Sequence, residues 1–377
     1  MSSLPAFMAR ALAQAQKALV ISSPNPRVGC VLTDAEGHVL GEGHTQRAGG
    51  PHAEIMALRD AHSRGVSVKG ATAWVTLEPC SHHGRTGPCC DALIEAGIGR
   101  VVAAISDPNP RVAGQGFARM RAAGIDVEIG PGGAESRELN LGFFSRMVRQ
   151  QPWVRVKAAA SLDGHTALPN GDSQWITGEA ARADGHAWRA RAGAVLTGVG
   201  TVRADDPRLD VRLAPQAADL PRQPALVIVD STLRTPPQAR LFDVAERPVW
   251  LYTASTDAAR IAALEARGAQ VQCLPDAEGR VDLRALMADL GRREVNELHV
   301  EAGPLLNGAL MRAGLVDEWL LYLAPKLLGA GAGLAHEPFA QGPLHTLAGA
   351  AALEFRSVEA LGPDLRIVAR MAGRDRF

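Results

Sequence analysis

One histidine, one glutamate and two cysteines constrain this chain most, because they form a ligand set only if the fold brings three separate segments together. The segments are His52-Ala53-Glu54, Pro79-Cys80 and Cys89. One imidazole and two thiolates can hold a Zn²⁺ ion with its fourth position open. A carboxylate two residues from the imidazole can move protons at a metal-bound water. The pattern predicts a hydrolytic zinc site with Glu54 as its acid/base.

The surrounding sequence places each ligand where a helix or strand begins or ends. Gly49-Gly50-Pro51 precedes a helical stretch, so we expect His52 and Glu54 in its first turn, with the proline at an early helical position. Residues 73–77 predict a short buried strand that ends before Cys80. Pro88 opens a second helix that contains Cys89. The positive ends of two helices would then face one metal and favour the thiolate forms.

A purely structural zinc site would need a fourth protein ligand. The candidates are Cys90, His82 and His83. We favour the open site because Glu54 would otherwise have no role. Cys90 follows Cys89 on a helix and points elsewhere by about 100°, so we expect it to be packed in the interior. Cys30 and Cys273 are likewise expected to be core residues.

These motifs, together with Asn25-Pro26-Arg27-Val28-Gly29 and the run from Leu77 to Cys89, resemble the cytidine deaminase-like superfamily. More narrowly, they resemble the deaminase domain of the bifunctional deaminase/reductase family of bacterial riboflavin biosynthesis. Eight residues separate the two cysteines, in place of the shorter Pro-Cys-x-x-Cys spacing of other deaminases. Gly87 stands where this family usually has proline. The resemblance implies that Asn25 hydrogen-bonds the substrate and that His82 and Arg85 line its pocket.

Length and the order of elements predict two α/β domains. The chain has 377 residues, more than a single hydrophobic core usually supports. Strands expected near 28–33, 73–77, 101–105 and 126–129 alternate with helices, which indicates an α/β/α layered, cytidine deaminase-like domain. A helical stretch from Ala134 to about Arg149 leads to Gln150-Gln151-Pro152. We place the boundary there, with a zinc-dependent pyrimidine deaminase domain in 1–150 and a second domain in 151–377.

The second domain is expected to have buried strands at 154–157, 194–196, 225–229, 249–252 and 298–300. It lacks the Gly-x-Gly-x-x-Gly fingerprint of the usual dinucleotide fold. Two loops of small residues, Thr197 to Thr201 and Glu301 to Gly308, would let phosphates approach backbone N–H groups. Alone, such loops are more often tight turns than cofactor sites.

Four segments of this half resemble the reductase domain of the same family, whose fold is similar to dihydrofolate reductase. They are Lys157 to Gly164, Ser173 to Thr177, Gly198 to Pro207 and Glu301 to Pro304. The resemblance implies an NADPH-dependent reductase. The implied NADPH contacts are Ala160, Trp175, Thr201, Asp205, Ser231, Gly303, Pro304, Leu305, Leu306, Asn307, Gly308 and Ala309. The implied substrate contacts are Ser173, Arg189, Leu209, Arg212 and Glu301.

Physical arguments support only some of these assignments. Arg189 and Arg212 suit a sugar phosphate, because a guanidinium meets phosphate with two parallel hydrogen bonds. Trp175 either packs on a cofactor ring or lies in the core, and Lys157 and Asp163 are supporting candidates. The sequence identifies no single residue as the partner of the NADPH 2′-phosphate. The candidate cations are Arg203, Arg234 and Lys326.

Composition limits the remaining alternatives. A formal net charge of +0 and 4% aromatic residues argue against a deaminase that acts on nucleic acid. No stretch is apolar enough to span a bilayer, and five cysteines indicate a reducing compartment. We expect a cytoplasmic homo-oligomer, a dimer or tetramer, that acts on a small molecule. A non-enzymatic second domain that senses NADPH or a flavin precursor stays open on the residues alone.

On the main interpretation, the first domain deaminates 2,5-diamino-6-(5-phosphoribosylamino)pyrimidin-4(3H)-one with zinc. The second domain then reduces the ribosyl group with NADPH, giving 5-amino-6-(5-phosphoribitylamino)uracil. Both steps follow from the resemblance rather than from composition or spacing.

Overall fold

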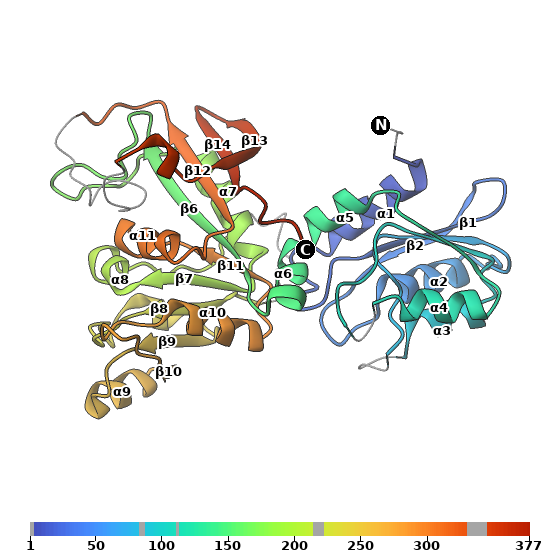
Figure 1. Cartoon of the computed structure of the whole chain (residues 1–377), viewed down its shortest axis with the longest axis horizontal. Coiled ribbons are helices and arrows are strands. Elements are labelled where there is room, and N and C mark those ends of the chain that lie inside the picture. The colour runs from blue at the N-terminus through green and yellow to red at the C-terminus, as the bar shows by residue number, and fades with distance from the viewer. Residues whose placement is uncertain (1–3, 83–86, 111–112, 214–221, 330–344) are drawn as a thin grey trace. The chain divides into compact units, whose positions relative to one another are not determined.

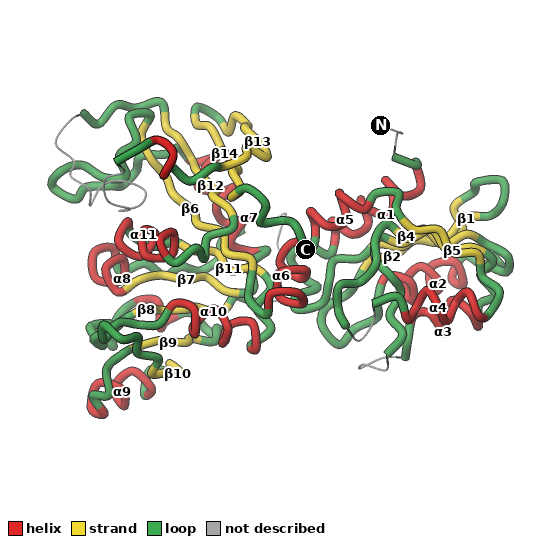
Figure 2. Tube along the Cα trace, viewed as in Figure 1, coloured by secondary structure: helices red, strands yellow, loops and turns green. Residues whose placement is uncertain are grey.

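The computed structural model describes residues 4–82, 87–110, 113–213, 222–329 and 345–377. The chain forms two compact units that divide between Gln150 and Gln151. Figure 1 labels most of their elements, and Figure 2 separates helices, strands and loops by colour. In the described part of the chain, no helix has the length and apolar character needed to cross a membrane.

The first unit is a five-stranded sheet between two layers of helices (Figure 1). Its strand order is β2-β1-β3-β4-β5, with β1 antiparallel to β2 and β3, and with β3, β4 and β5 parallel. Helices α1 and α5 lie on one face, and α2, α3 and α4 lie on the other. The elements are α1 (Ala6–Lys17), β1 (Gly29–Thr33), β2 (Val39–His44), α2 (Ala53–Ser63), β3 (Thr72–Val75), α3 (Cys89–Glu95), β4 (Arg100–Ala103), α4 (Gln115–Ala122), β5 (Asp126–Ile129), α5 (Gly133–Leu139) and α6 (Leu141–Arg149). The expected layered α/β/α architecture is confirmed.

Two strand glycines let helices lie directly on this sheet. A Cβ atom added at Gly29 in β1 would come within 1.9 Å of the Ala11 carbonyl oxygen of α1. One added at Gly43 in β2 would come within 2.5 Å of Met56 Cβ and 2.7 Å of the Ala53 carbonyl oxygen, both in α2. The backbones of helix and strand are therefore in contact, and the first turn of α2 is held at a fixed height above the sheet.

The helical stretch expected from Ala134 to Arg149 is two helices, because Asn140 interrupts it. The buried Asn140 amide donates to the carbonyl oxygens of Arg27, at 3.0 Å, and Ser136, at 3.1 Å. Its side-chain oxygen accepts from the Arg27 backbone N–H at 2.8 Å. An asparagine that bonds to two separate backbone segments favours a helix break over a continuous helix, and here it also anchors the turn before β1.

The second unit contains a nine-stranded sheet in the order β10-β9-β8-β7-β11-β6-β12-β14-β13. Neighbours from β10 to β12 are parallel, and β14 and β13 extend the sheet as an antiparallel hairpin. The elements are β6 (Trp153–Ser161), α7 (Glu179–Ala190), β7 (Ala194–Gly198), α8 (Val199–Asp205), β8 (Ala225–Val229), β9 (Val249–Thr253), α9 (Ala258–Glu265), β10 (Ala269–Cys273), α10 (Leu283–Arg292), β11 (Glu297–Val300), α11 (Pro304–Arg312), β12 (Glu318–Ala324), β13 (Leu353–Leu361) and β14 (Asp364–Met371).

Both faces of the central strands are buried, as parallel sheets require. Val154, Val156 and Leu196 pack with α10 and α11 on one face. Val195 and Leu226, which point the opposite way, pack with residues of α8 and α9 on the other. Helices α8 and α11 begin at the carboxyl ends of β7 and β11, which are neighbours in the sheet. This edge of the sheet therefore carries the segments that were expected to bind a cofactor.

The expectation that Cys273 is a core residue is wrong. It is exposed at the end of β10, the edge strand of the sheet. Cys30 is buried, as expected.

Candidate functional sites

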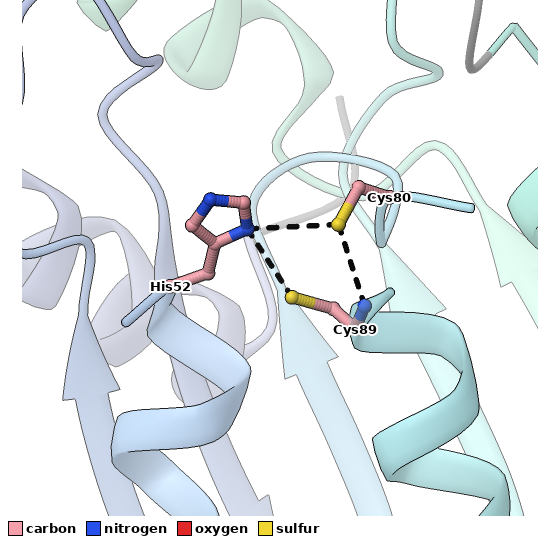
Figure 3. A group of neighbouring side chains, drawn as sticks. All are labelled: His52, Cys80 and Cys89. Carbon is pink, nitrogen blue, oxygen red and sulfur yellow. Dashed lines mark hydrogen bonds between the residues drawn. The ribbon is translucent and has the colours of Figure 1, made fainter. Parts of the chain in front are cut away.

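The structure brings His52, Cys80 and Cys89 together in the first unit (Figure 3). Nδ1 of His52 lies 3.6 Å from the Cys80 sulfur and 3.3 Å from the Cys89 sulfur. All three ligand atoms lie within 4.8 Å of one another. A tetrahedral zinc with ordinary bond lengths separates a nitrogen and a sulfur ligand by about 3.6 Å. The donor types and their spacing therefore fit a zinc ion.

Helix and strand ends position each of these side chains. His52 is the N-cap of α2, and Cys89 is the first residue of α3 after Pro88. Pro51 lies just before the N-cap, outside the helix in which it was expected. The backbone N–H of Cys89 donates to the Cys80 sulfur at 3.3 Å. Such a donor at a helix start stabilises a thiolate.

The two cysteines differ in acidity. The Cys89 thiol and then His52 lower the pKa of Cys80 to about 4 by hydrogen bonding to its sulfur. The pKa of Cys89 is raised well above the ordinary value, first by its hydrogen bond to Cys80 and then by burial. The pair therefore keeps one proton until a divalent cation displaces it, as metal binding to thiols requires.

Glu54 lies in the first turn of α2, with only 3% of its surface exposed. Burial raises the pKa of its carboxyl, and the neighbouring Cys80 charge adds to this effect. A carboxylate in such surroundings is a stronger base than one in water, because its protonated form is favoured. It lies close to the His52 N-cap, where a metal-bound water would need a proton acceptor.

No further histidine, cysteine or acidic residue in the described ranges joins this ligand group. Cys90 is buried, its sulfur lies 3.6 Å from Asp91 Oδ1, and burial raises its pKa to about 11. These properties fit the open site better than a fourth thiolate. His82 is half-buried, whereas His83 and Arg85 lie outside the described residues.

The motif that begins at Asn25 is fixed by its arginine. The Arg27 guanidinium donates to the Leu139 carbonyl oxygen at 2.7 Å and the Leu19 carbonyl oxygen at 3.2 Å. Asn25 is half-buried in the turn just before β1. Arg27 therefore holds the turn, and the Asn25 side chain is left for a polar partner.

Sequence reasoning missed two buried carboxylates near this site. Glu78 accepts the backbone N–H groups of Gly114 at 2.9 Å and Gly116 at 3.0 Å, so it fixes the segment before α4. Asp107 follows β4, and burial raises its pKa to about 7, with smaller contributions from Glu78 and Cys80. The available signal was an aspartate just after a buried parallel strand, where ligand-binding residues gather.

In the second unit, the two expected loops of small residues are helix starts. Strand β7 leads directly into α8, and α11 begins at Pro304, so Asn307 lies inside that helix rather than at its start. The two segments are adjacent, since a Cβ atom at Gly303 would lie 3.8 Å from Thr201 Oγ1, and one at Gly198 would lie 3.2 Å from Leu306 Cδ2. Two neighbouring helix starts, each with a glycine as its N-cap, fit the phosphates of a dinucleotide.

The other residues assigned to NADPH occupy the same edge of the sheet or the loops beside it. Ala160 is near the carboxyl end of β6, and Asp205 ends α8. Ser231 follows β8, and its hydroxyl accepts the Val281 N–H at 3.1 Å. Trp175 is 64% exposed, with the Arg182 guanidinium 4.8 Å from its ring centre, so it is not a core residue.

Three of the residues assigned to the reductase substrate form one charged cluster. Arg189 pairs with Glu301 at 2.6 Å and also donates to the Asp210 carbonyl oxygen. Arg212 pairs with the Asp210 carboxylate at 2.6 Å. Leu209 is buried beside Asp210 with a φ of 50°. Ser173 is half-buried on a separate loop, and no contact places it with this cluster in the described ranges.

Sequence reasoning also missed His186, which lies between the two arginines. Its Nδ1 accepts the backbone N–H of Arg212 at 3.2 Å, and its Nε2 lies 3.4 Å from the Arg212 guanidinium. Burial, reinforced by Arg189 and Arg212, lowers the pKa of His186 to about 4. The imidazole is therefore neutral, with Nδ1 as its acceptor nitrogen and the ring proton on Nε2.

Comparison with known proteins matches both units. Residues 1–105 match the cytidine and deoxycytidylate deaminase zinc-binding region, and residues 152–367 match the RibD C-terminal domain. The riboflavin biosynthesis protein RibD of Escherichia coli K12 is 47% identical over 372 residues, covering 95% of this chain and 97% of its own. That of Haemophilus influenzae is 43% identical over 376 residues, covering 96% and 95%.

Solved structures agree with these matches. Acinetobacter baumannii RibD has a TM-score of 0.87 at 38% identity, covering 97% of this chain and 98% of its own. A Thermotoga maritima diaminohydroxyphosphoribosylaminopyrimidine deaminase/5-amino-6-(5-phosphoribosylamino)uracil reductase has a TM-score of 0.84 at 32% identity, with the same coverage. With both domains matched along nearly its whole length, the chain belongs to the RibD family of riboflavin biosynthesis proteins, which join a deaminase domain to a reductase domain.

Proposed function

We propose that this chain deaminates 2,5-diamino-6-(5-phosphoribosylamino)pyrimidin-4(3H)-one in residues 1–150 and reduces the ribosyl group of the product in residues 151–377. The final product is 5-amino-6-(5-phosphoribitylamino)uracil. One observation carries this proposal: His52, Cys80 and Cys89 converge beside the buried Glu54 in a chain whose other unit is a RibD C-terminal domain.

His52, Cys80 and Cys89 would hold the zinc ion of the deaminase site. When bound, zinc supplies a Lewis acid that makes water acidic enough to attack the substrate near neutral pH. Glu54 accepts the proton of the attacking water and passes it to the ring nitrogen next to the carbon under attack. It then carries the remaining proton of the added hydroxyl to the leaving amine, so that the carbon–nitrogen bond breaks, the carbonyl forms and ammonia departs. The raised pKa of the Glu54 carboxyl suits it to all three transfers.

Asn25 hydrogen-bonds the pyrimidine or ribose of this substrate and orients it. Its half-buried position before β1, together with the Arg27 anchor, supports this role. The hydrogen bond from the Cys89 backbone N–H keeps the Cys80 sulfur in its ligand position.

In the reductase domain, NADPH supplies a hydride to C1 of the opened ribose when it is bound. Thr201 and the segment from Gly303 to Ala309 would hold its phosphates at the two helix starts. Its remaining groups would be contacted by Ala160, Trp175, Asp205 and Ser231. Arg212 and Arg189 face the substrate phosphate, while Glu301 keeps Arg189 in place at 2.6 Å. Leu209 and Ser173 complete the substrate contacts.

A cellular location and an oligomeric state are also proposed. Five free cysteines, with no disulfide in the described residues, support a cytoplasmic location. We expect a homo-oligomer, a dimer or tetramer, which sedimentation of the purified chain would measure.

The decisive experiment is anaerobic incubation of the zinc-loaded chain with the diaminopyrimidinone substrate, followed by mass spectrometry. Ammonia release should come first, and NADPH oxidation should follow with a product two hydrogens heavier. Omitting NADPH should stop the reaction at the deaminated intermediate. Failure to release ammonia from this substrate, with zinc bound, would contradict the deaminase assignment. Ammonia release without any NADPH oxidation would contradict the reductase assignment.

A further inference from the structure

A basic pocket lies at the carboxyl edge of the second sheet. Its volume is 390 Å³, within the range of small-molecule sites. Helix α8, the segment that follows β8, and α9 supply its walls, and none of the described residues that line it is acidic. The lining residues are Arg203, Leu233, Arg234, Thr235, Pro236, Pro237, Gln238, Arg260, Ala263 and Leu264.

Two of its three guanidinium groups have no partner among the described residues. Within the part of the chain that the structure describes, neither Arg203 nor Arg234 makes an ion pair or side-chain hydrogen bond. Arg260 differs, because it pairs with Asp257 at 3.4 Å and donates to the Thr232 carbonyl oxygen at 3.2 Å. Arg260 therefore ties α9 to the wall of the pocket, and the other two positive charges remain for a ligand.

The segment that carries Arg234 is held in place by hydrogen bonds to a buried carboxylate. The buried Asp230 carboxylate accepts the Thr235 N–H at 2.6 Å and the Thr235 hydroxyl at 2.7 Å. Leu233 is buried with a φ of 54°, so the chain turns sharply just before the arginine. This segment presents Arg234 from a fixed backbone, which lowers the entropy lost when a ligand binds.

Two lining residues of the pocket are close in sequence to residues assigned to NADPH, since Arg203 follows Thr201 and Leu233 follows Ser231 by two positions each. Arg203 and Thr201 both lie on α8, and residues two apart point about 200° apart on a helix. Thr201 lies beside Gly303 of the phosphate segment, so Arg203 projects toward the opposite side, where it lines the pocket. Ser231, another residue assigned to NADPH, begins the segment that carries Arg234.

We propose that this pocket binds the 2′-phosphate of NADPH, and that Arg203 and Arg234 select NADPH over NADH. The proposal rests on the proposed reductase function. Guanidinium groups meet a phosphate with paired, charge-assisted hydrogen bonds. The apolar wall formed by Leu233, Pro236 and Leu264 suits the adjoining ribose and adenine. The third cation considered from sequence, Lys326, donates to the Trp175 carbonyl oxygen at 2.9 Å and does not line the pocket.

The test compares Arg203→Gln, Arg234→Gln and the double variant with the full-length wild-type enzyme. Arg280→Gln is the matched control, since Arg280 is exposed in the same unit and is not among the lining residues. Calorimetry would measure the binding of 2′,5′-ADP, 5′-AMP and ribose 5-phosphate. Steady-state kinetics with the deaminated substrate would give kcat/KM for NADPH and NADH. Arg203→Lys and Arg234→Lys test whether charge alone is sufficient.

Each arginine should contribute roughly tenfold to 150-fold, the range for a charge-assisted hydrogen bond. Each Gln variant should lose that factor in 2′,5′-ADP affinity and in the ratio of kcat/KM for NADPH to that for NADH. Binding of 5′-AMP, kcat/KM for NADH and all values for Arg280→Gln should change less than threefold. The Lys variants should retain part of the preference.

Two outcomes would overturn the proposal while leaving the reductase function intact. One is a wild-type preference for NADPH that survives in the double variant. The other is equal loss of ribose 5-phosphate and 2′,5′-ADP binding, which would make the pocket a site for the substrate phosphate or for phosphates in general. A wild-type enzyme that oxidises neither nucleotide would contradict the reductase function itself, and 2′,5′-ADP binding would still test the pocket.

Discussion

Glu54→Gln is the substitution that tests the deaminase mechanism most directly. Glutamine keeps the size and the hydrogen-bonding geometry of the side chain but cannot accept the proton of water. Since only 3% of Glu54 is exposed, bulk solvent and buffer bases cannot reach its position to replace it. We therefore expect the variant to fold and to bind zinc, while deamination fails.

The size of the effect follows from the number of proton transfers that Glu54 performs. One general acid or base contributes roughly 10²- to 10⁴-fold. Glu54 serves three transfers in the proposed cycle, so the loss in kcat should be at or above 10⁴-fold on this scale. Glu54→Asp keeps the carboxylate but withdraws it by about one methylene, and a misplacement of about 1 Å can cost 10²-fold. The aspartate variant should therefore fall between wild type and glutamine.

The assay is ammonia release from the diaminopyrimidinone, with zinc content measured on the same samples. The reductase provides an internal control, because its assigned residues all lie beyond Gln151. NADPH oxidation with previously deaminated substrate should remain within twofold of wild type in both variants. A loss in ammonia release of less than tenfold in Glu54→Gln, with zinc retained, would remove Glu54 from the mechanism.

Three further predictions concern the metal, the domains and a histidine. Elemental analysis should find about one zinc per chain, and Cys80→Ser and Cys89→Ser should each lose it; full retention in both would exclude this ligand set. A fragment from Gln151 to Phe377 should fold and reduce the deaminated substrate, whereas a compact but inactive fragment would mean that the two units share a site. His186 has a folded pKa lowered to about 4 against roughly 6.5 when unfolded, so it should lower stability as pH falls from 6.5 toward 4. Nitrogen NMR at pH 6 should find its imidazole neutral, between Arg189, Arg212, Asp210 and Glu301; a protonated ring would contradict the geometry described.

The convergence of the three residues proposed to hold zinc could be predicted from sequence, because each one lies at the boundary of a helix or strand. Pro88 indicated the start of α3, and the glycines before His52 indicated the start of α2. Most of the buried parallel strands were also visible as short apolar runs, namely β3, β4, β6, β7, β8, β9 and β11, whereas the buried parallel strand β12 was not predicted. Because strands of this kind are buried on both faces, their sequences are apolar throughout and do not alternate between apolar and polar residues.

The strands at the two edges of the second sheet could not be predicted from the sequence. Strand β13 is exposed along most of its length, and β10 exposes three of its five residues. Their pattern therefore lacks the apolar run of an interior strand. The break at Asn140 depends on a bond to Arg27, 113 residues away in sequence. A pairing at that separation leaves no local signal.

The pocket of Arg203 and Arg234 could be proposed in part but not located. Both arginines were named as candidates, together with Lys326. Only the fold decides which of them meet, since Arg203 comes from a helix and Arg234 from the segment after the next strand. Charge composition cannot reveal such convergence, because Arg and Lys make up 40 of the residues.

Gly43 is inert chemically, yet the position of the reactive groups depends on it. A side chain there would press on Ala53 and Met56, the residues that flank Glu54 and Ile55 in the first turn of α2. Relief would require that turn to rise from the sheet and to carry His52 with it, since His52 caps the same helix. A random-mutagenesis screen for riboflavin auxotrophs should therefore recover substitutions at Gly43 alongside those at the metal ligands. Such alleles would be misread as marking contact with substrate, and second-site suppressors should map to small residues along the face of α2 that meets β2.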